Sequence, residues 1–379
     1  SNEFPKTGFI SFPVNIEKIT HQYYTSIGIG TPRHNMNLAI DISERFLWYD
    51  CGNHYNSSSY SPVLCDSPMC PGEFESSCEV CDGLPFKPGC SNFTCNFAIH
   101  NPFADFGYGG DLGQDFLFTP QLKLPRSFVS VCSESSRAPD FNILVGLPKG
   151  VKGALGLARQ SPFTLPSQIS SSFNVPPKFS LCLPSSGNKG HLFIGRGPTF
   201  STPLSQIGFD SRYSNYDYFF HLNSIHINHK PLQYNTSDFS VDLNGNVGTK
   251  ISTLNPFSVL HPQVYQPFVK AFVKAAKTKN MKRVKKVHPF GACYDANTVG
   301  DVPAIDLVLE AEQGHFGKVS YDISGHDSMV EVKKGVLCLA FVNGGIGALD
   351  GVLIGAHQLK DRILVFDEST SIISFSSSL

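Results

Sequence analysis

The chain has 379 residues, of which 16% are charged and 41% hydrophobic, and its acidic and basic residues nearly cancel to a formal net charge of −1. This length is enough for two domains of ordinary size. A near-neutral charge excludes a long-range field that would attract nucleic acid or an anionic membrane to the whole molecule. No apolar run approaches the ~20 residues needed to cross a bilayer, so no membrane-spanning segment is expected. An anionic partner would need a local basic site.

Eleven cysteines place the chain in an oxidising compartment, because such a density is rare among reduced intracellular proteins. Seven of them lie between Cys51 and Cys95. Three sequons fit N-glycosylation on surface loops, at Asn56, Asn92 and Asn235. The chain opens without a signal peptide, as expected of a mature amino terminus. These features predict secretion to the extracellular space or apoplast, with the protein-storage vacuole as the alternative.

Short strand-like runs separated by turn residues fill the first half of the chain, at 8–16, 22–30, 36–42, 46–49, 127–132, 179–183 and 191–194. The second half repeats this character, with runs at 219–227, 248–253, 304–309, 336–342, 352–354, 363–366 and 372–375. Helical spacing is limited to 165–172 and to 262–278, where Val264, Phe268 and Phe272 recur on one face. The pattern predicts a mainly all-β protein with a few short helices.

A weak internal repeat at a spacing of about 200 residues indicates two related lobes. The apolar strand at 38–43 is echoed at 248–253, and the glycine-containing run at 153–157 is echoed at 351–356. We therefore expect an N-terminal lobe at 1–200 and a C-terminal lobe at 201–379. Within the first lobe, the Ser, Pro, Gly and Asn content of 51–95 predicts a loop insertion that is stapled by disulfides and caps the lobe.

Several segments resemble the pepsin-like aspartic proteases, including their plant branch of nepenthesin-type enzymes. The run 24–32, which leads into Ile40-Asp41 and then Phe46-Leu47-Trp48, resembles the first catalytic strand of that family. Further matching segments follow in the family's order, at 153–157, 165–168, 190–195, 353–355, 365–367 and 373–375. The resemblance covers nearly the whole chain and implies a bilobal pepsin-like fold with two β-barrel-like lobes.

An aspartic protease needs two carboxylates that share a proton and a water, so that one acts as acid and the other as base. Each normally lies in Asp-Thr-Gly or Asp-Ser-Gly. The first site here reads Asp41-Ile42-Ser43, and the second places Ser252 where the other acid belongs. A serine hydroxyl cannot take up and return a proton as a carboxylate does. The resemblance therefore predicts a broken dyad and no protease activity, with Asp41 kept as a buried, hydrogen-bonded carboxylate. Residual proteolysis by Asp41 is the less favoured reading.

A closer resemblance is to plant proteins of this fold without the dyad, namely inhibitors of xylanases and xyloglucan endoglucanases, basic 7S globulins and γ-conglutins. The shared phrases lie at 46–48, 57–60, 88–95, 248–253, 289–293 and 327–330. This resemblance implies a proteinaceous inhibitor of microbial cell-wall-degrading glycoside hydrolases that acts in plant defence. The alternative is a storage or ligand-binding protein without inhibitory activity, similar to the 7S globulins and γ-conglutins. Oligomerisation is left open.

The inhibitors in this group insert a basic side chain between the two catalytic carboxylates of the target. The corresponding loop here, 295–303, holds no basic residue, and the chain stops at Leu379 where the group carries a further tail. The inhibitory residues are therefore unassigned. Because that tail usually holds a cysteine, the resemblance implies that Cys182 is unpaired and that Cys293 and Cys338 form a disulfide. The cysteines expected in disulfides are Cys51, Cys65, Cys70, Cys78, Cys81, Cys90, Cys95, Cys132, Cys293 and Cys338.

A local basic run begins in the helix expected at 262–278 and continues past its end, comprising Lys274, Lys277, Lys279, Lys282, Arg283, Lys285 and Lys286. It could bind acidic wall polysaccharide or an acidic enzyme rim, although a solvated helix end is the simpler interpretation. No recognition motif for nucleic acid accompanies it. Cys78 and Cys81 have zinc-like spacing, but disulfides are favoured among so many cysteines. We expect no metal and no cofactor.

Overall fold

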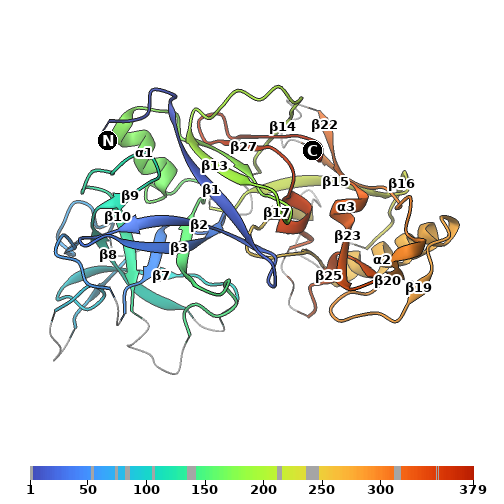
Figure 1. Cartoon of the computed structure of the whole chain (residues 1–379), viewed down its shortest axis with the longest axis horizontal. Helices are drawn as coiled ribbons and strands as arrows, with labels where there is room; N and C mark the ends of the chain where they lie inside the picture. Colours follow the sequence, from blue (N-terminus) through green and yellow to red (C-terminus); the bar gives the residue numbers. More distant parts are fainter. Residues whose placement is uncertain are drawn as a thin grey trace. The chain divides into compact units, whose positions relative to one another are not determined.

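The computed structural model describes residues 3–52, 55–72, 76–81, 86–104, 107–134, 142–210, 216–235, 247–310, 317–346, 348 and 350–379. Strands dominate, as the sequence predicts, and the few helices are short (Figure 1). The chain divides into two compact units. One comprises Ser1–Leu181 with Ser186–Thr199, and the other comprises Cys182–Ser185 with Phe200–Leu379.

The first unit is built on strands that follow one another in an antiparallel ladder, β1 (Phe9–Glu17), β2 (Gln22–Ile29) and β3 (His34–Asp41). In β1, Ile10, Phe12 and Val14 alternate with more exposed residues, which is the period of a strand with one buried face. The remaining strands of this unit are β4 (Leu47–Asp50), β5 (Ser61–Pro62), β6 (Ser77–Glu79), β7 (Thr94–Ile99), β8 (Tyr108–Gln114), β9 (Leu117–Phe118), β10 (Val129–Ser133), β11 (Val151–Gly156), β12 (Lys178–Cys182) and β13 (Gly190–Gly195).

The second unit has an antiparallel centre in which β15 (Phe219–Ile227) pairs with both β17 (Val247–Ile251) and β21 (Ile305–Glu310). A separate four-stranded sheet has the order β19 (Arg283–Val284), β20 (Cys293–Asp295), β24 (Val336–Leu339) and β23 (Met329–Lys333). The other strands are β14 (Ser205–Gly208), β16 (Lys230–Pro231), β18 (Ser258–Leu260), β22 (Lys318–Ile323), β25 (Phe341–Asn343), β26 (Val352–Ile354), β27 (Leu364–Asp367) and β28 (Ile372–Phe375).

Helices cover little of the chain. The first unit has α1 (Leu165–Phe173), capped by the Thr164 hydroxyl. The second unit has α2 (Pro262–Thr278), the 3-10 turn η2 (Ala296–Thr298), α3 (Gly325–Ser328) and α4 (Ala356–Leu359). Both helices expected from apolar spacing are present, and Val264, Phe268 and Phe272 form the buried stripe of α2. Among the described residues no helix is long and apolar enough to cross a membrane.

The internal repeat corresponds to one strand arrangement that occurs once in each unit. In the first unit β11 runs parallel to β3, and Gly156 lies opposite Asp41. In the second unit β26 runs parallel to β17, and Ile354 lies opposite Ile251. A glycine ends each copy because the backbone is crowded there. A Cβ on Gly156 would lie 2.3 Å from the carbonyl oxygens of Glu44 and Phe46. A Cβ on Gly355 would lie 2.4 Å from the carbonyl carbon of Phe257.

Two sequence expectations about local structure were wrong in detail. The segment 51–95 is not wholly loop, since it contains β5, β6 and the start of β7. β5 and β6 have two and three residues, which is too short to show the alternation of polar and apolar residues that signals a strand. The run expected at 336–342 is two strands, β24 and β25, which belong to different sheets. Ala340, between them, is fully buried and hydrogen-bonds through its amide to the carbonyl of Ser328.

Candidate functional site

Asp41 ends β3 and is almost completely buried in the first unit. One carboxylate oxygen accepts a hydrogen bond of 2.9 Å from the amide of Ser43, and the Asp41 carbonyl accepts another of 2.9 Å from the amide of Leu157. The backbone and the carboxylate are both fixed by these bonds. Asp41 is therefore a buried, hydrogen-bonded carboxylate.

A second buried carboxyl, that of Glu44, follows in the same loop. Its Oε1 accepts hydrogen bonds from the amides of Arg45 (2.7 Å) and Phe46 (3.3 Å), and the backbone of His100 also contributes a hydrogen bond to the carboxyl. Burial raises the pKa of Glu44 to about 8, and the negative charge of Asp41 adds to the increase. Glu44 is thus largely protonated at neutral pH. Sequence analysis missed this residue, because Glu44 lies among the polar residues Asp41, Ser43 and Arg45 and nothing local marks it as buried.

Ser252 follows β17 in the second unit and is also buried. Its hydroxyl donates a hydrogen bond of 2.8 Å to Oδ1 of Asn255 and accepts one of 3.1 Å from the Asn255 amide. Its own amide bonds to the carbonyl of Ile354 at 2.9 Å. The hydroxyl therefore closes a local turn. It offers neither the charge nor the proton affinity that a second catalytic carboxylate would supply.

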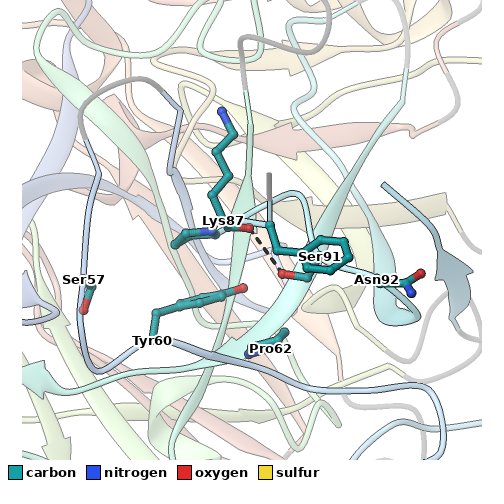
Figure 2. A pocket seen from close by; sticks show the side chains of 8 residues that line it. Ser57, Tyr60, Pro62, Lys87, Ser91 and Asn92 are labelled. Atoms are coloured by element: carbon teal, nitrogen blue, oxygen red, sulfur yellow. Dashed lines mark hydrogen bonds between the residues drawn. The ribbon is translucent and has the colours of Figure 1, made fainter. Parts of the chain in front are cut away.

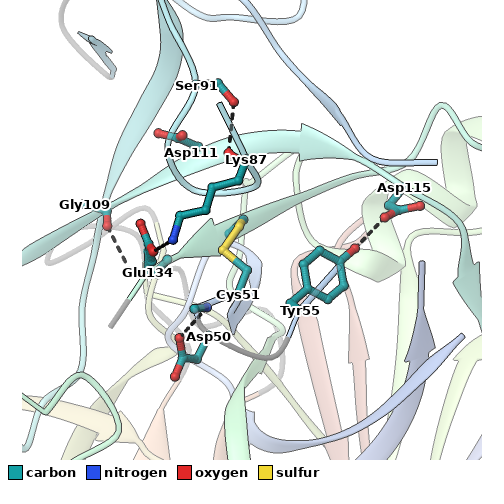
Figure 3. Close-up of a disulfide and its surroundings, with 12 residues drawn as sticks. Asp50, Cys51, Tyr55, Lys87, Ser91, Gly109, Asp111, Asp115 and Glu134 are labelled. Carbon is teal, nitrogen blue, oxygen red and sulfur yellow. Dashed lines mark hydrogen bonds and ion pairs between the residues drawn. A yellow bond between two sulfur atoms is a disulfide. The ribbon is translucent and has the colours of Figure 1, made fainter. Parts of the chain in front are cut away.

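The cysteine-rich insertion is held to the first unit by disulfides and buried polar contacts. Within it the structure pairs Cys65 with Cys78, Cys70 with Cys95 and Cys81 with Cys90. The Cys51–Cys132 disulfide joins its start to β10. Figure 3 shows this disulfide between two further anchors, the ion pair of Lys87 with Glu134 and the hydrogen bond from Tyr55 to Asp115. In the second unit Cys293 pairs with Cys338, and Cys182 is free.

The insertion also presents apolar side chains to solvent. We use "insertion surface" for Leu64, Met69, Val80, Phe86 and Phe93, whose exposed fractions are 42%, 36%, 53%, 67% and 48%. These are most of the exposed large hydrophobic residues in the described part of the chain. Disulfides hold the backbone that carries them, so ordering this surface against a partner would cost little entropy. Exposed apolar side chains on a disulfide-bonded segment are typical of a site for a protein partner.

A pocket of about 370 Å³ lies in the same insertion, lined by Ser57, Tyr60, Pro62, Phe86, Lys87, Pro88, Ser91 and Asn92 (Figure 2). The Ser91 hydroxyl donates to the carbonyl of Lys87 at 3.3 Å. The ammonium of Lys87 points away from the other lining residues in Figure 2 and pairs with the buried Glu134. The pocket is therefore lined mainly by rings and hydroxyl groups, and its one cation is already neutralised.

The asparagines of the three predicted sequons, Asn56, Asn92 and Asn235, are all exposed. Thr236 and Ser237, which complete the third sequon, lie outside the described residues. Asn92 lies on the rim of the pocket. Within the described ranges, no group of three or more His, Cys, Asp or Glu residues is placed to hold a metal ion.

Family models match the chain in two parts. Residues 23–196 match a model described as "Xylanase inhibitor N-terminal", and residues 217–377 match one described as "Xylanase inhibitor C-terminal". The chain is 36% identical to "Probable aspartic proteinase GIP2" of Nicotiana benthamiana, over 97% of this chain and 88% of that protein. It is 34% identical to "Gamma conglutin 1" of Prunus dulcis, over 97% of this chain and 86% of that protein.

Solved structures agree with these matches. The crystal structure of basic 7S globulin from soybean is similar with a TM-score of 0.84 and 30% identity, over 98% of this chain and 97% of that one. An aspartic proteinase from Irpex lacteus is similar with a TM-score of 0.64 at 13% identity, over 98% of this chain and 97% of that one. The second likeness concerns the fold alone, and it confirms the predicted pepsin-like architecture.

Proposed function

The chain belongs to the xylanase-inhibitor family, and from this premise we propose that it is a secreted, non-catalytic protein that inhibits a microbial cell-wall-degrading glycoside hydrolase. The resemblance to basic 7S globulins and γ-conglutins is confirmed by its relatives. The target would be of the xylanase or xyloglucan endoglucanase type. The disulfides suit an oxidising extracellular space such as the apoplast.

The observation that carries this proposal is the state of Ser252. Its hydroxyl is committed to a turn with Asn255, and Asp41 is left as the only carboxyl of the predicted dyad. One carboxylate cannot supply both the acid and the base of peptide hydrolysis. A pepsin-like fold without that chemistry serves by binding, and the xylanase-inhibitor family implies glycoside hydrolases as the kind of protein that is bound.

The loop at 295–303 contains no basic residue, so it has no basic side chain to insert into a target. It is short and held in place: the side chain of Asp295 accepts from the Asn297 amide at 3.0 Å, and Asp301 pairs with Lys279 of the preceding segment. The insertion surface is the better docking element, because it lies on a disulfide-bonded segment and carries exposed apolar side chains, Phe86 foremost. We therefore assign contact with the target to the insertion surface.

An inhibition panel tests the proposal. Purified protein is titrated against secreted fungal xylanases and xyloglucan-specific endoglucanases, with a casein digest at acid pH alongside. We expect dose-dependent loss of one glycosidase activity without casein cleavage. In the same assay Phe86→Ala should weaken inhibition, whereas Ile19→Ala should not, since Ile19 is equally apolar and 87% exposed but lies outside the insertion. Equal effects of the two substitutions would rule out the insertion surface.

The pocket beside Phe86 favours a second candidate function, that of a storage or ligand-binding protein. Its volume of about 370 Å³ and its ring-and-hydroxyl lining suit a small neutral ligand such as a sugar. Silence across the whole inhibition panel, together with a saturable thermal shift by a small oligosaccharide, would favour this function over inhibition.

A further inference from the structure

Basic residues are segregated into one stretch of the second unit. Residues 247–294 contain no Asp or Glu, yet they carry Lys250, Lys270, Lys274, Lys277, Lys279, Lys282, Arg283, Lys285 and Lys286. Because the whole chain has 30 basic and 31 acidic residues, the remainder of the chain is acidic. The near-neutral total therefore hides a concentrated positive region.

Three of these lysines form a stripe on α2. Lys270, Lys274 and Lys277 are spaced four and three residues apart, which places them on one face of a helix, and all three are exposed. The opposite face, with Val264, Phe268 and Phe272, is buried. The lysine stripe is therefore the solvent side of a helix whose other side is fixed in the core.

The basic stretch continues from α2 onto the four-stranded sheet. The segment 279–282 connects α2 to β19. It is anchored by Met281, which is 5% exposed and whose amide donates a hydrogen bond of 3.1 Å to the carbonyl of Ala276. Ring contact between Phe272 of α2 and Tyr294 of β20, with centroids 6.2 Å apart, holds the helix against this sheet. Arg283 lies in β19, the edge strand, and Lys285 and Lys286 follow it. Figure 1 shows α2, β19 and β20 gathered in one region of the chain.

We call the exposed members of this region the basic face: Lys270, Lys274, Lys277, Lys282, Arg283, Lys285 and Lys286. The described structure gives an ion pair to Lys279, with Asp301, but to no member of the basic face. Lysines on an edge strand also prevent pairing with other sheets, which accounts for the charges beside β19. It does not account for the stripe on α2, where there is no edge to protect.

The side chains of the basic face suit a flexible polyanion better than a folded protein or a nucleic acid. Lysine is depleted from protein interfaces, which depend on apolar and aromatic anchors, and residues 247–294 contain none of the exposed large hydrophobic side chains of the described structure. These residues therefore also expose no Phe, Tyr or Trp ring on which a nucleic-acid base could stack. A single arginine among six lysines also offers little of the forked, bidentate geometry that favours phosphate.

We propose that the basic face binds a linear polysaccharide that carries repeated carboxylates, a polyuronate. Successive carboxylates along the chain would meet the lysines of α2 and then the cations beside β19. Such binding would hold the protein on an acidic polysaccharide matrix. The basic face belongs to the second unit and the insertion surface to the first, so the two activities can be tested with separate variants.

The test measures affinity for polygalacturonate oligomers of defined length, with neutral xyloglucan and single-stranded DNA of similar length as comparison ligands. The face variant is Lys274→Gln/Lys277→Gln/Lys285→Gln/Lys286→Gln. The control variant, Lys149→Gln/Lys152→Gln/Lys189→Gln/Lys318→Gln, removes the same charge from exposed lysines elsewhere. We expect the face variant to lose roughly tenfold or more in affinity at low salt and the control to change by less than about twofold, with wild-type binding falling steeply as salt rises.

Three outcomes would overturn the proposal: wild-type affinity in the face variant, equal losses in the two variants, or DNA binding as tight as polygalacturonate binding. Thermal melts of both variants check that the fold is retained. The inhibition panel, run on the face variant, separates this inference from the proposed function, since inhibition should persist when polyuronate binding is lost.

Discussion

The hydroxyl of Ser252 and the residue Asn255 form a reciprocal pair, in which Ser252 donates to the Asn255 side chain at 2.8 Å and accepts from its amide at 3.1 Å. The turn lies at the end of β17, in the position that Asp41 has at the end of β3. The same strand arrangement therefore ends in a carboxylate in one unit and in a turn-closing hydroxyl in the other. The second unit thus has hydrogen bonds between Ser252 and Asn255 where the first unit has a carboxylate.

We predict that Ser252→Ala lowers the free energy of unfolding by ~1 kcal/mol, because two part-buried groups of Asn255 lose their partner. For a unit of this size the melting temperature should fall by about 2–4 °C. Calorimetry measures both quantities. A melting temperature unchanged within error would show that the turn is held by the backbone alone.

The companion variant Ser252→Asp addresses the chemistry. We expect no acid-dependent, pepstatin-sensitive casein cleavage, because Ile42 and Ser43 replace the hydroxyl and glycine that support the first catalytic aspartate in active enzymes. Ser252→Thr, which keeps a hydroxyl, is the matched control for stability. Cleavage by the aspartate variant would mean that a second carboxylate is all the site lacks.

A second prediction concerns Glu44 and pH. Its pKa is about 8 in the folded chain against an ordinary value of 4.5, so between these values the folded state holds a proton that the unfolded chain has released. The contribution of Glu44 to the free energy of unfolding is therefore highest below pH 4.5. It falls as the pH rises toward 8, by up to ~1.4 kcal/mol per pH unit. The neutral variant Glu44→Gln should lose this dependence and gain stability relative to the parent as pH rises.

Melting temperatures of both proteins between pH 4 and 8 measure the effect. Glu79→Gln, at a half-exposed position in the same unit, is the control and should leave the pH profile unchanged. Parallel profiles for the parent and Glu44→Gln would show that Glu44 is ionised in the folded protein. The charged or titratable neighbours in this region are Asp41 and Tyr108, and burial raises the pKa of Tyr108 above the tested range.

Features of short range were predictable from the sequence. The bounds of α2 follow from the spacing of Val264, Phe268 and Phe272. The strand-and-glycine segments at 153–157 and 351–356 were recognised as alike from sequence, and each runs parallel to an apolar strand of its own unit. Asp41 and Ser252 were singled out by the resemblance of their segments to the two catalytic motifs of pepsin-like aspartic proteases. Periodicity and local motifs report what a residue's immediate neighbours need.

Features that depend on contacts between distant segments were not predictable. Glu44 looks like a surface acid in sequence, and only the folded chain shows that it is buried, with 5% of its surface exposed. The partners of Cys65, Cys70 and Cys81 were open because many pairings of the same cysteines fit one sequence. Arg362, which is completely buried, carried no local signal, since its acidic partners Asp322 and Asp327 lie 40 and 35 residues earlier in the chain.

The last prediction concerns this buried charge cluster in the second unit. Asp327 is fully buried and receives two cations, Arg362 Nη2 at 3.0 Å and Lys360 Nζ at 3.1 Å. Arg362 also lies over the Tyr321 ring, 4.2 Å from its centroid. Removing Asp327 leaves Lys360 without its anion and leaves Arg362 only the longer ion pair with Asp322, at 3.9 Å, whereas removing Arg362 leaves Asp327 still paired with Lys360.

We therefore expect Asp327→Asn to cost ~3–5 kcal/mol of unfolding free energy, more than Arg362→Met, because an uncompensated buried charge is the main penalty. The double variant should cost less than the sum of the two single changes. Urea unfolding measures all three values. The exposed pair of Lys279 and Asp301 is the control, where Asp301→Asn should change stability by at most ~1 kcal/mol, since Asp301 has a side chain that is 82% exposed. If the double variant loses the sum of the two single losses in unfolding free energy, Asp327 and Arg362 stabilise the fold separately. If the two single variants lose the same free energy, the stabilisation comes from Arg362 and its contact with Tyr321.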